Sequence, residues 1–266
     1  MMDRRQLAVV IPAYNEAVTL RTIAHAAFAE VPRVIVIDDG STDGTARAVA
    51  GLPVTLLRNP RNLGKAASLW RGIDMALAEG AQGIVTLDGD GQHEPRDLPR
   101  LIDAFRAHRD ALIVGSRLHA QERIPRNRYY ANRFANFWIS WAAGQAIEDT
   151  QCGYRIYPAK VLIALRQRLA SSRGFVFESE ILIEAGRQGT SIVTVPVTAV
   201  YPQGRRSRFR PVTDIALIVR MVAWKLASWG FYPQGLMRYC RQLASAHKPR
   251  SSPRCPSSGR CGGWSS

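Results

Sequence analysis

Short apolar runs that alternate with helix-like segments constrain the fold of this chain more than any other feature. Five such runs, rich in Val, Ile and Leu, are each too short for a buried helix, and the segments between them have helical composition. Strands that alternate with helices predict an α/β fold with a mostly parallel sheet and helices on both faces. The expected strands are residues 7–11, 33–37, 54–57, 83–87 and 111–114, and the expected helices are residues 18–30, 43–50, 64–80 and 96–109.

The pattern changes after the fifth expected strand, where helix-like segments follow one another. We expect helices at residues 127–143, 158–170 and 176–188. A β stretch within residues 192–200 contains Pro196, which lacks an amide donor, so we expect it at an edge of the sheet.

The chain divides into three parts by composition. Residues 1–212 are expected to form one α/β domain, and residues 213–240 an apolar C-terminal helix for which a membrane surface is one candidate location. Residues 241–266 are basic and become rich in Ser, Gly and Pro, so we expect a disordered tail.

The positive charge is concentrated at the C-terminal end. The formal net charge is +15, of which residues 1–200 carry +4 and residues 201–266 carry +11. A basic stretch of this kind suits an anionic partner such as a membrane surface or a phosphorylated substrate. We do not expect nucleic-acid binding, because the chain has no recognised reader motif and no aromatic residues interleaved with the cations in the manner of such proteins.

The most apolar segment, residues 215–232, is not expected to cross a membrane. Arg220 and Lys225 interrupt it, and it falls short of the roughly 20 residues that a span requires. The first apolar run is too short for a signal peptide, and the four cysteines form no CxxC pair. We therefore expect no zinc site and a cytoplasmic protein, peripheral on the cytoplasmic face of the membrane.

Acidic residues follow two of the expected strands directly. Asp38 and Asp39 end one strand, and Asp88 and Asp90 follow another, with glycines beside both pairs. Single acids at strand ends are often turn formers, but two pairs at the ligand-binding edge of a parallel sheet indicate a site. Converging carboxylates supply the hard oxygen ligands that Mg²⁺ or Mn²⁺ accepts. The chain lacks the GxxxxGK[ST] loop of P-loop enzymes and the GxGxxG turn of dinucleotide oxidoreductases.

The motifs together resemble glycosyltransferase family 2, the inverting enzymes of the GT-A fold. VVIPAYNEAVTL, VIVIDDGSTDGT, RNLGKAASLWRGID and GIVTLDGDGQH occur in the order typical of that family, and the resemblance covers roughly residues 7–215. DGDGQH, VGSR, DTQCGYRIYP and FVFESEILIEAGRQG are most similar to the polyprenyl-phosphate glycosyltransferases of the dolichol-phosphate mannosyltransferase type. The resemblance implies a GDP- or UDP-sugar donor, a polyprenyl-phosphate or other lipid acceptor, a divalent cation and a membrane surface as partners.

The resemblance also implies a role for each motif residue. Nucleotide contacts are expected from Pro12, Tyr14, Glu16, Asp38, Asp39, Asn62, Gly64, Lys65 and Asp88. Asp90 and Gln92 would hold Mg²⁺ or Mn²⁺, and Asp90, Arg117 and Asp149 would be catalytic. Arg117, Arg155, Arg205, Arg206 and Arg208 would meet the acceptor phosphate or the membrane, with Glu178 and Glu180 at the border of the acceptor cleft.

Two features leave the reaction open. Asp149 matches the position of a general base, which a hydroxyl acceptor requires and an anionic lipid phosphate does not. A family 2 enzyme acting on a glycan or other hydroxyl acceptor is therefore the alternative. A nucleotidyltransferase with a similar acidic sheet edge would release pyrophosphate instead of a nucleoside diphosphate.

Overall fold

The computed structural model describes residues 3–118, 126–169, 176–198, 200 and 211–246, without the side chains of residues 126–128, 211–215 and 246. Seven strands form one sheet in the order β3-β2-β1-β4-β6-β5-β7. All neighbours in it are parallel except β6, which runs antiparallel to β4 and β5. The strands are β1 (Leu7–Ala13), β2 (Val34–Asp38), β3 (Thr55–Arg58), β4 (Gly83–Thr86), β5 (Leu112–Ser116), β6 (Arg155–Pro158) and β7 (Ile192–Pro196).

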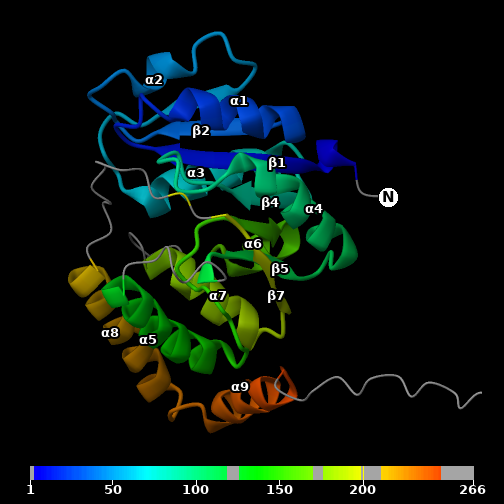
Figure 1. Ribbon diagram of the computed structural model, residues 1–266, viewed down its shortest axis with the longest axis vertical. Helices are drawn as coiled ribbons and strands as arrows, with labels where there is room; N and C mark the ends of the chain where they lie inside the picture. The colour runs from blue at the N-terminus through cyan, green and yellow to red at the C-terminus, as the bar shows by residue number, and fades with distance from the viewer. Residues whose placement is uncertain (1–2, 119–125, 170–175, 199, 201–210, 247–266) are drawn as a thin grey trace, which may run out of the picture.

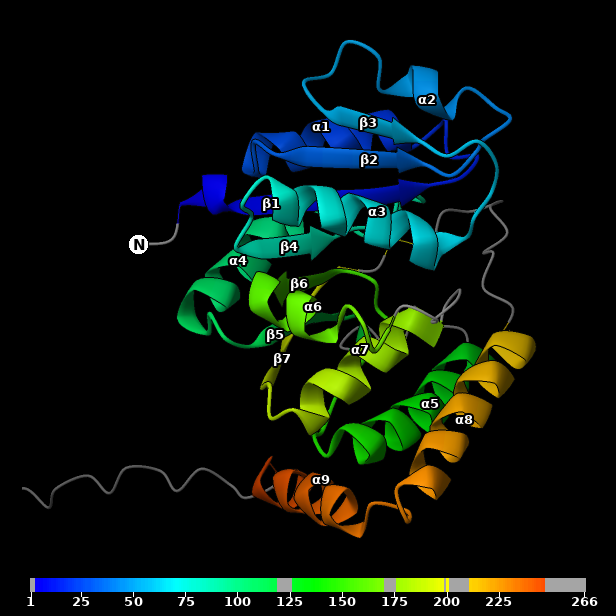
Figure 2. The ribbon, with the colours of Figure 1, turned by 180° about the vertical axis from the view of Figure 1, so that it is seen from behind.

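Helices cover both faces of the sheet, as predicted (Figures 1 and 2). On one face lie α1 (Leu20–Glu30) and α4 (Leu98–Ala107); the other carries α3 (Lys65–Ala78), α6 (Ala159–Leu165) and α7 (Val176–Arg187). The short α2 (Thr45–Ala48) precedes β3, and single 3₁₀ turns span Arg4–Gln6 and Pro95–Asp97.

Successive side chains of the central strands point to opposite faces of the sheet and pack into two separate hydrophobic cores. Ala8 and Val10 of β1 pack toward α3, whereas Leu7, Val9 and Ile11 pack on the opposite face. All five are fully buried, which explains why the strands read as continuous apolar runs rather than as alternating patterns.

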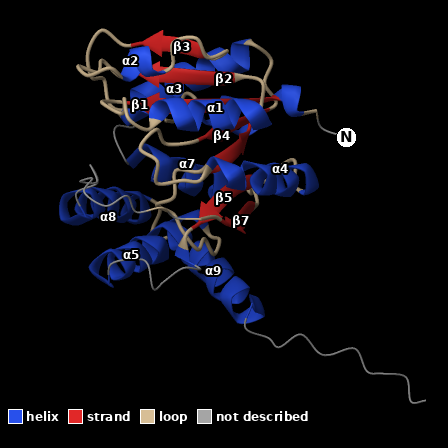
Figure 3. Ribbon diagram, turned by 45° about the horizontal axis from the view of Figure 1, so that its top comes forward, coloured by secondary structure: helices blue, strands red, loops and turns tan. Residues whose placement is uncertain are grey.

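Three further helices gather at the end of the molecule away from β3 (Figures 1 and 3). They are α5 (Arg126–Ala143), α8 (Pro211–Ser228) and α9 (Pro233–Ala246), and α5 packs against α7, α8 and α9. No helix in the described part of the chain has the length and apolar character that crossing a bilayer demands.

The structure differs from the sequence predictions in three places. Strand β6 was not expected, because its four residues include an arginine and a proline and form no apolar run. The segment expected as one helix over residues 213–240 is two helices, divided by Gly230, Phe231 and Tyr232, all with positive φ. The expected disorder over residues 241–266 is wrong for residues 241–246, which complete α9; the remainder lies outside the described residues. The prediction of an edge strand within residues 192–200 is confirmed, although the strand, β7, ends at Pro196.

Candidate active site

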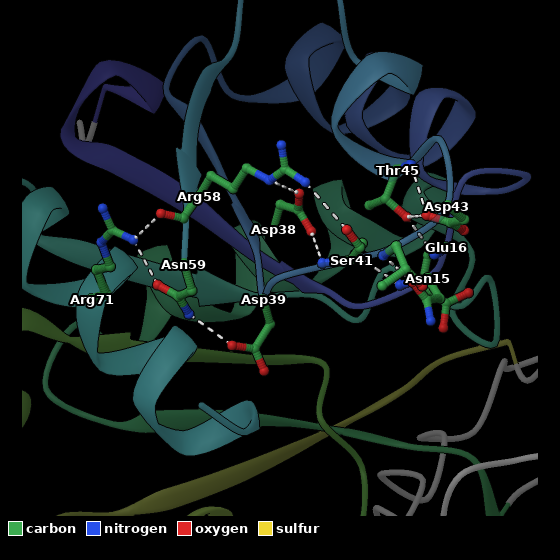
Figure 4. A network of polar contacts seen from close by, with 11 residues as sticks. Asn15, Glu16, Asp38, Asp39, Ser41, Asp43, Thr45, Arg58, Asn59 and Arg71 are labelled. Atoms are coloured by element: carbon green, nitrogen blue, oxygen red, sulfur yellow. Dashed lines mark hydrogen bonds and ion pairs between the residues drawn. The ribbon is translucent and has the colours of Figure 1, made fainter. Parts of the chain in front are cut away.

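The loop after β1 is bonded to the loop after β2, which forms one wall of the site (Figure 4). The Asn15 amide donates to Ser41 Oγ at 2.9 Å, and the Asn15 side-chain oxygen accepts from the Thr42 amide at 2.9 Å. The Glu16 amide donates to Thr45 Oγ1 at 2.8 Å. Asn15 has a φ of 52°, a left-handed conformation that asparagine tolerates better than most residues. Pro12 lies near the end of β1, and Tyr14 and Glu16 follow it on this hydrogen-bonded loop.

Asp38 and Asp39 both hold the chain around them rather than standing free at the sheet edge (Figure 4). Asp38 accepts from the Ser41 amide at 2.9 Å and forms an ion pair with Arg58 at 3.1 Å. Asp39 accepts from the amides of Leu63 and Gly64, each at 2.9 Å. The Asp39 carboxylate thus fixes the loop that leads into α3, where Lys65 begins the helix.

Gly40 is required between these loops. Its φ is 71°, and a Cβ placed there would lie 2.4 Å from the carbonyl carbon of Arg61. No side chain fits without displacing the backbone of the loop before α3.

Lys65 bridges two carboxylates from distant parts of the chain. Its ammonium lies 2.8 Å from Asp88 Oδ1 and 3.2 Å from Glu178 Oε2. Burial disfavours the ammonium, but the two carboxylates outweigh it, so the pKa of Lys65 is raised. Burial likewise opposes ionisation of Asp88, yet Lys65 holds the pKa of Asp88 below its usual value. Oε1 of the buried Glu178 has no hydrogen-bond partner within the described structure.

Gly153 closes the space beside this cluster and was not singled out from the sequence. A Cβ on Gly153 would lie 2.8 Å from Asp88 Oδ2, 2.9 Å from Glu178 Oε1 and 3.2 Å from Lys65 Nζ. The Gly153 carbonyl accepts from Thr86 Oγ1 at 2.7 Å, which holds this backbone against β4. The sequence could have indicated this role, because Gly153 lies inside the DTQCGYRIYP motif and a glycine lets other groups approach the backbone closely.

Asp90 and Gln92 lie together, as the sequence predicts. Asp90 accepts from the Gln92 backbone amide at 3.0 Å and from the Gln92 side-chain amide at 2.7 Å. Burial and the nearby Asp88 raise the pKa of Asp90. Thr19 Oγ1 donates to the Gly89 carbonyl at 2.7 Å and so ties this turn to the start of α1. Among the described side chains, no three or more of His, Cys, Asp and Glu converge as a metal site on their own.

His93 is buried directly behind the acidic turn. Burial, with the Arg117 guanidinium as the next contribution, lowers the pKa of His93 to about 4, so the ring is neutral at pH 7. The ring lies 5.5 Å from that of Tyr154. A neutral imidazole is consistent with the expected role of His93 as a loop residue near the site. It would not act as a cation that binds phosphate.

Arg117 and Asp149 form a buried pair with two side-chain hydrogen bonds. Arg117 Nε donates to Asp149 Oδ2 at 2.9 Å, and Arg117 Nη2 donates to Oδ1 at 3.0 Å. The Arg117 backbone amide also donates to Asp149 Oδ2, at 3.1 Å. Burial raises the pKa of Asp149, but Arg117 lowers it more, and the net pKa is below normal. The sequence left Asp149 open between a general base and a group that orients a neighbouring arginine; in the structure both of its carboxylate oxygens accept hydrogen bonds from Arg117.

Arg155 also differs from its expected role at the acceptor phosphate. It is fully buried in β6, and it donates to the carbonyls of Cys152 at 2.7 Å, Glu178 at 2.6 Å and Thr150 at 2.8 Å. Arg155 therefore holds the turn before β6 against the start of α7, with its guanidinium bonded to main-chain carbonyls. Glu180, two residues after Glu178 on α7, pairs with Lys225 at 3.5 Å. Arg205, Arg206 and Arg208 lie outside the described residues.

The site thus has an acidic half and a cationic half at one edge of the sheet. The loops after β1, β2 and β4 contribute the acidic half, and Arg117 at the end of β5 contributes the cation. Arg117 lowers the pKa of both Asp88 and His93, which shows that the two halves interact electrostatically. An arrangement of this kind can hold a nucleoside diphosphate and a second anion side by side.

Comparison with known proteins agrees with this arrangement. The profile described as "Glycosyl transferase family 2" matches residues 8–164. The chain is 31% identical to a polyprenol monophosphomannose synthase from Mycolicibacterium smegmatis, over 84% of this chain and 86% of that protein. It is 30% identical to an undecaprenyl-phosphate mannosyltransferase from Micrococcus luteus, over 84% of this chain and 95% of that protein.

A solved structure confirms the predicted fold. Glucosyl-3-phosphoglycerate synthase from Mycobacterium tuberculosis, in complex with phosphoglyceric acid, superposes with a TM-score of 0.62. The two chains are 21% identical, and the match covers 84% of this chain and 79% of the other. The profile match over more than half of the chain, together with the two relatives, shows that this protein belongs to glycosyltransferase family 2.

Proposed function

We propose that this enzyme transfers a sugar, with inversion, from a nucleotide sugar to a polyprenyl phosphate at the cytoplasmic membrane surface. The observation that carries the proposal is the Arg117–Asp149 pair. The carboxylate at the position of a general base is occupied in holding a cation, which suits an acceptor that arrives as an anion. A hydroxyl acceptor would need a base to remove its proton.

The relatives support the same acceptor. Two are named as enzymes that act on polyprenol or undecaprenyl phosphate with mannose, and a third, from Rhizobium johnstonii, as a dodecaprenyl-phosphate galacturonate synthase. Their common feature is a prenyl phosphate, whereas the sugars differ. The names of these relatives therefore support a prenyl-phosphate acceptor for this enzyme more strongly than they support any one sugar.

The proposed reaction is a single displacement. An oxygen of the acceptor phosphate attacks the anomeric carbon, a new carbon–oxygen bond forms, and the bond from that carbon to the donor diphosphate breaks. The nucleoside diphosphate leaves with the electron pair of the broken bond, and no proton has to be removed from the acceptor. Arg117, oriented by Asp149, would hold the acceptor phosphate, and the loops at Asp39, Lys65 and Asp88 would hold the donor.

The residues beside β4 fit a divalent cation. Asp90 is partly buried next to Asp88, and burial together with the neighbouring Asp88 charge raises the pKa of Asp90, a cost that a bound cation would offset. Asp90 would supply a carboxylate oxygen, and Gln92 its amide oxygen if the side-chain amide turned over. One or two carboxylates completed by substrate phosphates are the usual environment of Mg²⁺. The cation would neutralise charge on the departing diphosphate. Structures of glucosyl-3-phosphoglycerate synthase hold Mn²⁺ together with UDP.

The proposal is tested by product analysis. The purified full chain is incubated with GDP- and UDP-sugars in turn, with Mn²⁺ or Mg²⁺, and with undecaprenyl phosphate, dolichyl phosphate or an alkyl glycoside as acceptor. Mass spectrometry should detect a glycosylated lipid phosphate and release of a nucleoside diphosphate. Transfer to the alkyl glycoside alone would establish the hydroxyl-acceptor alternative, and release of pyrophosphate would establish a nucleotidyltransferase.

A further inference from the structure

The exposed aromatic side chains of the described residues all lie at one end of the molecule. Of twelve large hydrophobic side chains with high exposure, eight lie on α5, α8, α9 or the turn between α8 and α9. They include every exposed aromatic residue, whereas the four elsewhere, Val18, Leu56, Leu63 and Ile163, are aliphatic and scattered. We call this end the α5–α8–α9 face (Figures 1 and 2). The eight are Tyr130, Phe134, Phe137, Leu217, Trp224, Phe231, Met237 and Leu243.

The exposed residues form stripes along two of the helices. Tyr130, Phe134 and Phe137 are spaced by four and three residues, so they share one side of α5. Leu217 and Trp224 are seven residues apart and share one side of α8. Trp224 is 76% exposed, which is unusual for a residue type that is highly buried on average.

The turn between α8 and α9 projects one of these aromatic rings outward. Gly230, Phe231 and Tyr232 have φ values of 61°, 60° and 42°, a conformation that is costly for the two aromatic residues. The turn is anchored from within: the Arg187 guanidinium lies 3.4 Å from the centre of the Trp229 ring, and the Tyr232 carbonyl accepts from Trp141 Nε1 at 3.3 Å. Phe231, between these two anchors, is 64% exposed. A strained backbone that is held in place and presents a bare ring indicates a contact outside the chain.

The charge of the face identifies the kind of partner. The sequences of α5 and α9 contain no Asp or Glu, and Asp214 is the single acid of α8. Arg133, Arg220, Arg238 and Arg241 are exposed on these three helices. Aromatic rings mixed with arginines suit an anionic lipid surface, where the rings enter the headgroup region and the cations meet lipid phosphates. A symmetric contact between two copies would instead bring the same basic surfaces together.

We propose that the α5–α8–α9 face docks on an anionic bilayer, with Trp224 and Phe231 inserted at the headgroup level. This inference rests on the proposed function, because it supplies the surface from which a lipid acceptor would reach Arg117. Arg117 directly follows β5, and α5 is the next helix along the chain, so one helix of the docked face follows the acceptor end of the site in sequence.

The test compares charge-matched variants of the full chain in vesicle sedimentation. The docking variant is Trp224→Glu with Phe231→Glu; the control is Val18→Glu with Ile163→Glu, which adds the same charge at exposed apolar positions elsewhere. Wild type should bind vesicles containing about 30% phosphatidylglycerol more strongly than pure phosphatidylcholine vesicles, and less strongly at high salt. The docking variant should lose at least about tenfold in vesicle affinity, and the control should stay within about twofold.

Two results would overturn the inference. One is a docking variant that binds vesicles as wild type does while thermal melting shows both variants folded. The other is a wild-type dimer in size-exclusion chromatography with light scattering that the docking variant splits, which would assign the face to a second copy. Transfer to a water-soluble short-chain prenyl phosphate is measured in parallel and should be equal in all three proteins. Its absence in wild type would refute the proposed function and leave the vesicle result to decide the docking face.

Discussion

The charged side chains of this site form ion pairs: Arg117 with Asp149, and Lys65 with two carboxylates. Arg117 is 6% exposed and Asp149 is fully buried, so each needs the other, because an unpaired charge at such a position is strongly destabilising. The Lys65 ammonium is likewise balanced by the carboxylates of Asp88 and Glu178. The substrate groups are therefore expected to meet side chains whose positions are set before binding.

Substitution of Asp149 by Asn separates a positioning role from a base. Asn keeps one acceptor for Arg117 but loses the charge, so we expect KM for the lipid phosphate to rise about tenfold with a smaller change in kcat. Loss of a general base would instead lower kcat by about 100-fold or more. Steady-state kinetics with the acceptor varied measures this, and Arg117→Lys, which leaves Asp149 intact, should show the same pattern.

The same pair predicts the acid sensitivity of the fold. The pKa of Asp149 in the folded protein lies below its unfolded value, so its contribution to stability is full above about pH 4. That contribution is lost as the pH falls through the lowered pKa. Urea unfolding between pH 6 and pH 3 should show a shallower loss of unfolding free energy in Asp149→Asn than in wild type. Equal slopes would mean that the pKa of Asp149 is the same in the folded and the unfolded protein.

Asp90 is expected to matter for the donor and not for the fold. Replacing Asp90 by Ala removes the repulsion with Asp88, so the thermal midpoint should not fall. Calorimetric titration with UDP or GDP should show binding that Mn²⁺ strengthens in wild type and not in the variant. Nucleotide binding that is indifferent both to Mn²⁺ and to Asp90→Ala would refute the metal assignment.

At the level of elements, the strands that lead into the acidic loops and the helices α5 and α7 were predictable from sequence, whereas β6 was not. Strands β1, β2 and β4 are buried on both faces and appear as apolar runs, and their acidic ends identify the site edge. Strand β6 carries the buried Arg155, a residue type that sequence analysis assigns to the surface. Its burial depends on carbonyls of Thr150, Cys152 and Glu178, which only the folded chain brings together. The pairing of Asp149 with Arg117, 32 positions apart, is equally non-local.

The packing of α5 on α7 depends on a glycine and can be tested. A Cβ on Gly186 would lie 2.6 Å from the Ala143 carbonyl oxygen and 2.9 Å from Ala143 Cβ, so Gly186→Ala must push the helices apart. We expect a loss of about 1–3 kcal/mol in unfolding free energy, as for other overpacked cores. Gly44→Ala is the control, since its Cβ meets nothing closer than 3.8 Å. Chemical denaturation should leave the control within about 0.5 kcal/mol of wild type.

At the scale of the whole molecule, charge and chemistry are separated along the chain. The site residues described here fall between Pro12 and Glu178, where the chain is nearly neutral, and the excess charge follows residue 200. Long-range attraction to an anionic surface therefore need not disturb the acidic groups that hold the donor.

Removal of residues 247–266 tests this separation. The deletion takes away four cations, Lys248, Arg250, Arg254 and Arg260, and no acid. We expect kcat/KM for a water-soluble short-chain prenyl phosphate to be unchanged, and transfer to vesicle-embedded acceptor to fall at low salt, since about 1 kcal/mol per cation is typical near an anionic membrane. A truncated enzyme that loses activity on the soluble acceptor would place part of the site in the deleted residues.

Because β6 is antiparallel to β4 and β5, its first residue lies at the sheet edge where the site is found. Arg155 opens β6 opposite Thr86 of β4 and Val114 of β5, at the edge where those strands end. The chain therefore leaves the site at Arg117, builds α5, and returns to the same edge with Asp149 and Gly153. The pairing of β1 with β2 and β4 uses no residue between Arg117 and Gly153, so variation in the loops of this stretch need not disturb those strands, provided that α5 keeps its packing on α7, α8 and α9. Such loop variation would let enzymes of this fold accept different acceptors while the strands and loops that would hold the nucleotide sugar stay the same.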